Sequence, residues 1–370
     1  MRFAEAVLRQ ARVPARPHAP RILSYFEFWP SWLFYAPVAA YWVLLGLRYG
    51  NLCLPTAANP AITVGGLCGE SKRAILDQVP SSERDVLARY TSVLTDNTDA
   101  TADVLAAEQA LAAAGLDYPL VAKPDIGCNG SGVRLLASRS DLSRYLREFP
   151  RNCTVLLQEL IPDEGEAGLF YIRHPGAQHG YLSSVTLKQP PFVVGDGHST
   201  LRQLILADPR AGRVSQLYLP RLAQRLHEIP RQGEHVRLVF VGNHCKGSLF
   251  RNGIDVATEA LSGRVDELAR ALPEFYFGRI DVRFTSLSAL ARGEGFRVIE
   301  INGVGSEPTH IWDPATRLRE AWHAQFFHYG AAFRIGAANR GRGAKPASVM
   351  TVWRNWRLQN RLMRRYPMND

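Results

Sequence analysis

Four polar residues recur at a spacing of two within two apolar runs of the sequence. Arg279 and Asp281 interrupt FYFGRIDVRF, and Glu300 and Asn302 interrupt FRVIEIN. Residues two apart on a β-strand share a face, so each pair is expected to point to one side while its neighbours face a core. Two adjacent strands of this kind would gather Asp281, Glu300 and Asn302. Three oxygen-bearing ligands, two of them anionic, suit Mg²⁺.

The alternative for this cluster is a salt bridge between Arg279 and Glu300 at the edge of a sheet. Carboxylates held close together repel each other, and a bound cation removes that repulsion. The recurrence of polar residues at period two in both strands favours the metal site.

A glycine-rich segment, YPLVAKPDIGCNGSGVRLL, occupies residues 118–136. It predicts a strand that ends at Lys123, a loop containing Gly127, Gly130 and Gly132, and a second strand. Glycines let backbone N–H groups approach a phosphate, and a lysine adds a point charge for the same group. A simple glycine-rich hairpin turn is the alternative.

Two further strands are expected to carry polar residues at their ends. TVLLQELIPDEGEAGLFYIR predicts a strand ending at Gln158 and Glu159, with Glu166 leading into the next strand, and a later alternating strand ends at Lys188. A free strand edge can bind an adenine ring, and a nearby carboxylate can hold ribose hydroxyls. Isolated acids of this kind are more often surface residues.

In this order, the motifs VAKPDIGCNGSGV, LQELI with a later glutamate, LK, GRIDV and VIEIN resemble the ATP-grasp superfamily. The resemblance is strongest to the carboxylate–amine ligases typified by D-alanine–D-alanine ligase, and GDGHSTLRQLI resembles cyanophycin synthetase-like enzymes. It extends over residues 60 to 315 or so. It implies an α+β fold in which two α+β lobes clasp ATP. Residues 1–55 depart from the family, because a reduced, aromatic-rich helical segment stands where a Rossmann-like lobe is usual.

The resemblance implies a role for each matched position. Arg279 would steady an acyl-phosphate or oxyanion, Lys188 would act beside it on the ATP phosphates, and the three oxygen ligands would bind two Mg²⁺ ions, with Mn²⁺ as an alternative. Lys72, in GGLCGESKRAIL, is the expected additional lysine. Gln158 to Ile161 would form the adenine hinge. The implied ATP-binding residues are Lys72, Lys123, Gly127, Gly130, Gly132, Gln158, Glu159, Leu160, Ile161, Glu166 and Lys188.

The implied activity is an ATP-dependent, ADP-producing ligase that forms an amide through an acyl-phosphate. The alternative is an ATP-binding scaffold without catalysis, or a membrane-associated interaction protein. Candidates to hold the carboxylate and amine substrates are polar residues near or beyond the metal ligands, each of which also has a structural interpretation: Arg173, His174, His244, Arg251, Glu307 and His310.

The net charge of +10 is concentrated at the two ends of the chain. Residues 1–21 hold five arginines and one glutamate, and residues 331–370 hold eight arginines and one lysine against one aspartate. Basic ends of this kind favour an anionic membrane surface over nucleic acid in this context, and a solvated tail is the alternative. The five cysteines show no paired spacing, which indicates free thiols in a reducing compartment.

Residues 28–47 carry no charge and are long enough to span a bilayer. Pro30 and Pro37 predict two short helices joined at an angle, and the aromatic density is typical of a membrane interface. The arginines before this stretch and the ATP requirement of the rest of the chain both favour the cytosolic side. We therefore expect a surface-lying wedge, with packing as ordinary core as the alternative. TVWRNWRLQNRLMRRY predicts a basic amphipathic helix. The expected location is cytoplasmic, peripheral on the inner membrane face, with small-molecule or lipid-linked substrates.

The sequence thus predicts five segments. They are a basic and aromatic N-terminal segment (1–55), a linker and reduced pre-ATP-grasp region (56–117), a small lobe (118–187), a large lobe with the metal site (188–330) and a basic amphipathic tail (331–370).

Overall fold

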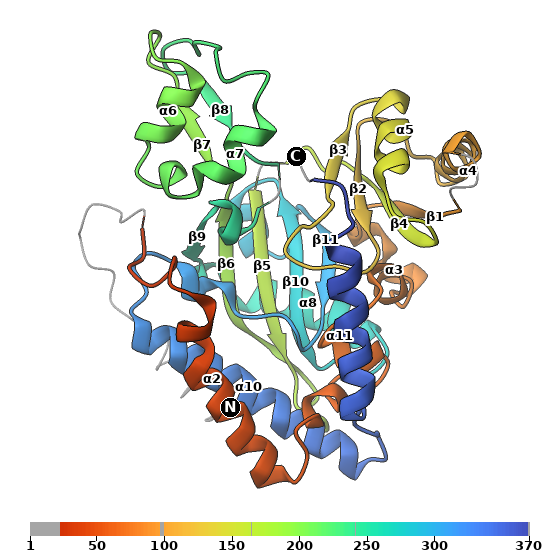
Figure 1. Ribbon diagram of the computed structural model, residues 1–370. Helices are drawn as coiled ribbons and strands as arrows, with labels where there is room; N and C mark the ends of the chain where they lie inside the picture. Colours follow the sequence, from red (N-terminus) through yellow and green to blue (C-terminus); the bar gives the residue numbers. More distant parts are fainter. Residues whose placement is uncertain (1–22, 97–99, 164, 241, 369–370) are drawn as a thin grey trace.

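The structure is a computed structural model that describes residues 23–96, 100–163, 165–240 and 242–368. It combines helices with antiparallel sheets, which confirms the predicted α+β class (Figure 1). The predicted arginine-rich segment at residues 1–21 lies outside the described residues. The helices are α2 (Ser31–Tyr49), α3 (Lys72–Leu76), α4 (Ala100–Ala113), α5 (Arg139–Glu148), α6 (Leu201–Ala207), α7 (Ser215–Arg221), α8 (Glu259–Ala271), α9 (Leu287–Ala291), α10 (Leu318–Gly341) and α11 (Val349–Met363).

The small lobe is a four-stranded antiparallel sheet covered by α4 and α5. Apolar residues of both helices, including Val104 and Leu146, share a core with the sheet residues Leu120 and Leu157. In spatial order its strands are β1 (Tyr90–Thr95), β4 (Cys153–Glu159), β2 (Leu120–Pro124) and β3 (Arg134–Leu136).

The large lobe is a five-stranded antiparallel sheet with helices on both faces. Ile280 and Val282 share a core with α8 on one face, whereas Phe277 and Phe170 pack with Ile335 of α10 on the other. Strand alternation therefore puts Arg279 and Asp281 on the α10 face. In spatial order the strands are β11 (Phe296–Asn302), β10 (Phe277–Phe284), β5 (Gly165–Ile172), β6 (Tyr181–Gln189) and β9 (Leu249–Asn252).

A third, smaller unit stands above the large sheet in Figure 1. It consists of the hairpin of β7 (Phe192–Val194) and β8 (His235–Arg237) with α6 and α7 packed on it. A buried ion pair ties this unit to the N-terminal segment, since Arg210 Nη1 donates to Glu27 Oε2 at 3.0 Å. Burial raises the pKa of Glu27, although Arg210 acts in the opposite direction.

The N-terminal aromatic stretch forms one helix, α2, which corrects the predicted pair of short helices. Pro37 lies inside α2 and Pro30 caps its start. Proline removes a single N–H donor from a helix, and ring contacts with α10 stabilise the continuous helix. Tyr41 packs on Phe326 with ring centroids 4.8 Å apart, and other contacts follow along both helices.

Helix α2 is only half covered by the rest of the protein. Phe34 and Val38 are buried, as the core interpretation predicted, while Trp32, Leu44 and Leu47 are between 63% and 72% exposed. In the part of the chain that the structure describes, no helix is long and apolar enough to cross a bilayer. Before Tyr90 this part contains no strand, so helices and short 3₁₀ turns fill that region.

The structure moves three of the predicted segment boundaries. The small lobe already begins at β1, inside the predicted linker. Strands β5 and β6, predicted within the small lobe, pair with β10 and β9 and so belong to the large sheet. The boundary at residue 331 falls inside α10, whose Phe333 and Ile335 are fully buried. The predicted basic amphipathic helix is α11, which begins at Val349.

Candidate active site

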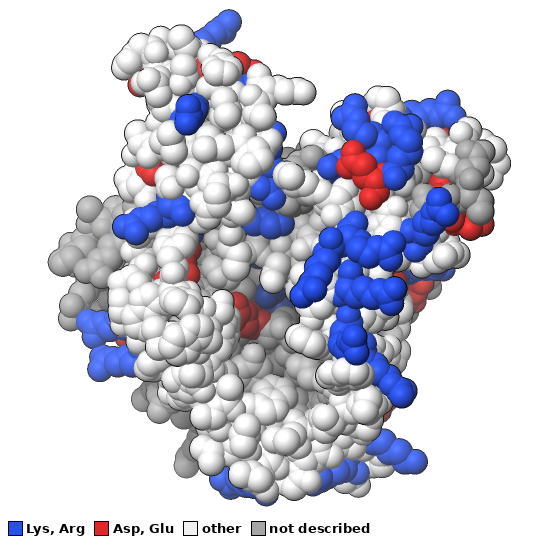
Figure 2. Space-filling view, in the orientation of Figure 1, with Lys and Arg blue, Asp and Glu red and all other residues white. Residues whose placement is uncertain are grey.

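A cavity of about 480 Å³ lies between the two lobes and collects most of the residues singled out from the sequence. Figure 2 shows acidic side chains at the base of this hollow. The predicted residues that line it are Lys72, Lys123, Gly127, Gly130, Gln158, Glu159, Leu160, Ile161, Glu166, Lys188, His244, Arg279, Asp281, Glu300, Asn302 and Glu307.

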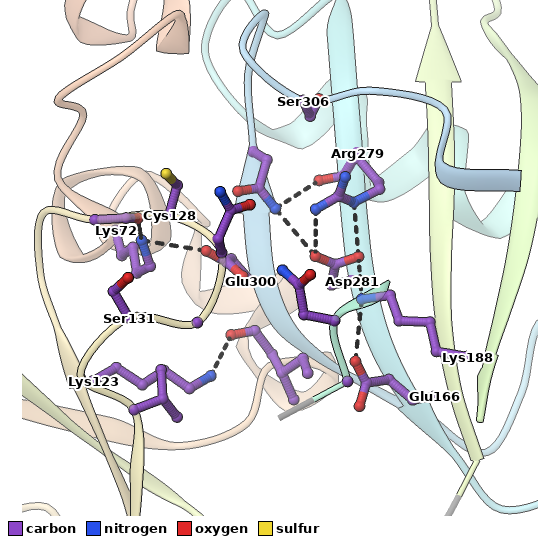
Figure 3. A pocket seen from close by; sticks show the side chains of 18 of the residues that line it. Lys72, Lys123, Cys128, Ser131, Glu166, Lys188, Arg279, Asp281, Glu300 and Ser306 are labelled. Carbon is purple, nitrogen blue, oxygen red and sulfur yellow. Dashed lines mark hydrogen bonds and ion pairs between the residues drawn. The ribbon is translucent and has the colours of Figure 1, made fainter. Parts of the chain in front are cut away.

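Strands β10 and β11 are neighbours, as predicted, and their register brings the polar residues together. Asp281 lies opposite Glu300, and Arg279 lies opposite Asn302. The Asp281 carboxylate accepts from Arg279 Nε at 2.9 Å and Nη2 at 3.1 Å, and from Lys188 Nζ at 3.0 Å (Figure 3). Arg279 thus pairs with Asp281 on its own strand, and the ion pair of Glu300 is with Lys72 instead.

The charges in this cluster hold one another in their ionised forms. Burial opposes ionisation of Asp281, but Arg279 and Lys188 outweigh it and lower the pKa of Asp281 to about 2. Burial likewise opposes the charge on Lys188, and the attraction of Asp281 and Glu166 raises its pKa overall. Both side chains are therefore charged at neutral pH.

The donor set of the predicted metal site suits a hard cation. Asp281, Glu300 and Asn302 offer only oxygen ligands, on the facing strands β10 and β11. The Asn302 amide nitrogen faces Asp281 Oδ2 at 3.3 Å, and rotation of this amide by a half turn would present its oxygen instead. Among the described residues no three His, Cys, Asp or Glu side chains form a metal-binding group. The site would therefore rest on two carboxylates, one carboxamide and oxygens of the ligand.

Two further lysines enter the cavity from different elements. Lys123, on β2, donates to Gln158 Oε1 at 2.6 Å, and burial lowers its pKa to about 8 although Glu300 acts to raise it. Lys72, on α3, lies 3.3 Å from Glu300 and also donates to the Gly127 carbonyl. Ser71 caps α3 and donates to Asp125, which places Lys72 beside the glycine loop.

The loop between β2 and β3 has the backbone shape that its glycines predicted. Gly130 and Gly132 have φ of 66° and 69°, in the left-handed region. Since β2 and β3 pair with each other, the loop is also a hairpin connection, so the two interpretations are compatible. Gly127 and Gly130 line the cavity, whereas Gly132 packs against Pro124. From the opposite side, Lys246 Nζ donates to the Gly130 carbonyl at 3.0 Å.

Glu166, predicted to hold ribose, is engaged by two basic side chains. Lys188 Nζ lies 3.1 Å from its Oε1, and Arg283 Nε lies 3.5 Å from its Oε2. Arg283 was not singled out from the sequence, although it stands two residues after Asp281 on the same face of β10. This spacing of two from Asp281 is the sequence signal that could have identified Arg283 as a residue of the site.

Of the six substrate candidates, the structure brings Glu307 and His244 into the cavity. The ring of His244 stacks on that of Trp312 at 4.4 Å between centroids, and burial lowers the pKa of His244 to about 4, so it is neutral. Glu307 accepts from Tyr35 at 2.8 Å, from Trp312 at 2.8 Å and from Gln325 at 2.9 Å.

The other four candidates do not line the cavity and have structural surroundings. Arg173 lies over the ring of Tyr276 at 4.5 Å, and Arg251 pairs with Asp313 at 3.5 Å. His174 and His310 are held in their neutral forms, because burial lowers the pKa of each, that of His310 to about 4.

Several lining residues were missed by sequence reasoning. Glu70 is the most informative, because its Oε2 is buried without a hydrogen-bond partner and its side chain lines the cavity. It stands two residues before Lys72, a proximity that the sequence showed. Others come from segments far apart in the chain, which single-sequence patterns do not connect: Tyr35, Asn243, Tyr329 and Gln359.

No protein-family model matches the chain. Its sequence is similar to the glutathione biosynthesis bifunctional protein GshAB of Streptococcus mutans, with 31% identity over 171 residues. The match covers 41% of this chain and 21% of that protein, so the chain spans about a fifth of its curated relative.

Three solved structures match parts of the chain at low similarity. A bifunctional glutathione synthetase from Pasteurella multocida has 17% identity, coverage of 69% of this chain and 35% of the other, and a TM-score of 0.34. The D-cycloserine synthetase DcsG has 18% identity, coverage of 75% and 70%, and a TM-score of 0.35. A D-alanine–D-alanine ligase from Bacillus anthracis has 14% identity, coverage of 75% and 69%, and a TM-score of 0.39.

By its ordered sequence motifs, the chain resembles ATP-grasp carboxylate–amine ligases. The ordered motifs that carry this resemblance in the sequence meet in one cavity of the structure. The motifs around Lys123 and the glycine loop form its small-lobe wall, and those around Lys188, Asp281 and Glu300 form its large-lobe wall.

Proposed function

We propose that this protein is an ATP-grasp ligase that joins a carboxylate to an amine at the expense of ATP. The observation that carries the proposal is that Asp281 and Glu300 lie opposite each other on β10 and β11, beside Arg279 and Lys188. Across the cavity from them lies the glycine loop, with Lys72 and Lys123. These groups come from two lobes and line one cavity, as a nucleotide and two reacting groups require.

The proposed reaction has two steps. An oxygen of the substrate carboxylate attacks the γ-phosphorus of ATP, the bond to the bridging oxygen breaks, and ADP leaves with an acyl-phosphate formed. The amine nitrogen then attacks the acyl carbon, the C–O bond to phosphate breaks, and the amide forms with loss of a proton. Such chemistry depends on positioning and charge stabilisation more than on a nucleophilic side chain.

The lysines and the glycine loop are proposed to hold the triphosphate. Lys123 and Lys188 are each 9% exposed, so their charges act in surroundings that screen little. Leu160 and Ile161 follow the end of β4 and line the cavity, where they are proposed to contact the adenine. Asp281, Glu300 and Asn302 would hold Mg²⁺, which neutralises charge on the transferred phosphoryl group.

Arg279 is proposed to steady the negative charge at the reacting carboxyl group. Its guanidinium is held as a fork by both oxygens of Asp281, and Nη1 donates to the carbonyl of Glu307 at 3.2 Å. A fixed guanidinium loses little freedom when it binds an oxyanion, which favours this role. The loop from Gly303 to Glu307 beside it would face the acceptor.

We further propose that the substrate is lipid-linked or destined for the cell envelope, and that the protein acts at the cytoplasmic membrane face. Apolar side chains are exposed on α2 and α11, including Trp32, Leu44, Trp353 and Trp356. Figure 2 shows basic side chains gathered along α11. Exposed aromatic and basic groups together suit an anionic interface.

The test of the ligase proposal is an ADP-release screen over carboxylates and amines, with mass spectrometry of the product. Asp281→Asn should abolish ADP release, whereas Glu267→Gln, which changes a 67% exposed glutamate on α8, should not. Thermal unfolding establishes that both variants fold. ADP release by Asp281→Asn at the rate of the unmodified protein would contradict the proposal.

A further inference from the structure

The C-terminal helix α11 lies against the glycine loop, where it contributes a residue to the cavity (Figure 1). Gln359 bridges two segments: its Oε1 accepts from the Gly69 N–H at 2.6 Å, and its Nε2 donates to Cys128 Sγ at 3.4 Å. Met363, one turn later, places its sulfur 3.7 Å from the same Cys128 sulfur. The inner face of α11 therefore contacts the glycine loop through Gln359 and Met363.

Tyr366, just after α11, makes a second attachment. Its hydroxyl donates to the Ile126 carbonyl at 2.6 Å, and its ring stacks on Phe149 at 5.1 Å between centroids. A Cβ on Gly132 would lie 3.0 Å from Tyr366 Cβ. Glycine at 132 thus permits the close approach of this residue to the loop.

The chain continues to hold the small lobe after Tyr366. Arg134, at the start of β3, donates through Nε to the Met368 carbonyl at 2.6 Å. The contacts of the C-terminal segment therefore reach from Gly69 to β3, across both ends of the glycine loop. The membrane-binding role predicted for α11 as a basic amphipathic helix involves only the opposite, outer face of this helix.

We propose that α11 and Tyr366 form a clasp that positions the glycine loop for the triphosphate of ATP, with Gln359 and Tyr366 as positioning residues. This rests on the proposed function, in which the loop covers the phosphates. A glycine-rich loop loses much conformational freedom when it closes on a ligand. Anchors that order the loop in advance remove part of that cost and raise affinity.

The experiment measures two quantities on the full chain with Tyr366→Phe and Gln359→Ala. The first is hydrogen–deuterium exchange of the loop amides in residues 126–133 without nucleotide, and the second is the Kd for ATP with Mg²⁺. Tyr366→Phe keeps the ring stack and removes only the hydroxyl. The matched controls are Leu358→Ala and Arg361→Ala, whose side chains are exposed on the same helix.

Each clasp variant loses one hydrogen bond to residues 126–133. It should therefore speed loop exchange and weaken ATP binding about fivefold, while controls and melting temperatures stay near the unmodified protein. A rise in KM for ATP with little change in kcat is expected, which a general loss of stability would not produce. Loop exchange and Kd within about twofold of the unmodified protein in both variants would overturn the clasp. Failure of the unmodified protein to bind ATP would instead refute the ligase proposal. The two failures can be distinguished, since loop exchange is measured without nucleotide and so tests the clasp independently of ATP binding.

Discussion

Tyr35 donates a hydrogen bond of 2.8 Å to Glu307, although 272 residues separate the two in the sequence. Trp312 and Gln325 donate to the same carboxylate, so three neutral donors surround it. The backbone carbonyl of Glu307 in turn accepts from Arg279. Helix α2 therefore helps to build the wall of the cavity next to the guanidinium.

Tyr35→Phe tests whether α2 shapes the acceptor end of the cavity. Burial and the nearby Glu307 raise the pKa of Tyr35, so its hydroxyl is a neutral donor at all physiological pH values. Loss of a hydrogen bond to a charged group costs about 1.5–3 kcal/mol, which we expect to appear as lower stability and a higher KM for the acceptor. The control Tyr25→Phe changes a ring that is 67% exposed. Equal acceptor KM values in both variants would contradict the assignment.

Glu300→Gln tests the proposed metal ligands. The substitution keeps the size of the side chain and removes its charge, so the Mg²⁺ concentration that gives half-maximal ADP release should rise at least about tenfold, or 1.4 kcal/mol. Removal of divalent ions with a chelator should abolish ADP release in the unmodified protein. Glu294→Gln, at a side chain that is 65% exposed, is the control. The same Mg²⁺ dependence in both variants would argue that Glu300 serves only as the partner of Lys72.

The spacing of residues along the sequence predicted the centre of the site. The remaining lining residues and the sheet order depend on contacts between segments that are distant in the sequence. Asp281 and Glu300 were predicted to lie together because polar residues recur at a spacing of two in both strands. The sheet to which β5 belongs depends on its pairing with β10, more than a hundred residues later, which periodicity does not encode. In the same way, Tyr35 and Gln359 enter the cavity through the packing of α2 and α11 on other elements. The apolar pattern of α2 and the basic pattern of α11 predicted a membrane-facing surface. They did not predict which residue of each helix lines the cavity.

The pH dependence of ATP binding tests the position of Lys123. Burial lowers its pKa to about 8, and only the ammonium form attracts phosphate. Below about pH 8 the lysine is already charged. Above it, ATP binding must bring a proton with it, so affinity should fall by up to about tenfold per pH unit. Titration calorimetry in two buffers of different ionisation heat should detect proton uptake at about pH 9 and little at about pH 7.

Lys123→Arg tests whether the proton taken up on ATP binding goes to Lys123 or to another group in the cavity. Arginine stays charged, so the uptake assigned to Lys123 should disappear. Burial also lowers the pKa of Lys246, which contacts the glycine loop, to about 8, and its contribution would remain in the variant. Undiminished uptake in Lys123→Arg would assign the titration to Lys246 instead.

Vesicle flotation tests the proposed membrane surface of α11. Its outer arginines are exposed, and the guanidinium of Arg357 lies 4.7 Å above the ring of Trp353. Each basic residue near an anionic leaflet contributes about 1 kcal/mol, so the double variant Arg357→Gln/Arg361→Gln should bind vesicles of anionic phospholipid about thirtyfold more weakly. ADP release on water-soluble substrates should be unchanged, because both side chains are exposed and neither lines the cavity.

The control for this experiment is Arg225→Gln/Arg231→Gln, which removes the same charge from the unit that carries β7 and β8. Vesicles of zwitterionic lipid give a second comparison, and added salt should release the protein from anionic vesicles because it screens exposed charges. If the unmodified full chain does not float with anionic vesicles at low salt, the membrane proposal is wrong. Equal weakening by both double variants would show that total charge, and not the face of α11, governs binding. A specific loss in the α11 variant would place the outer face of this helix on the membrane while its inner face contacts the glycine loop.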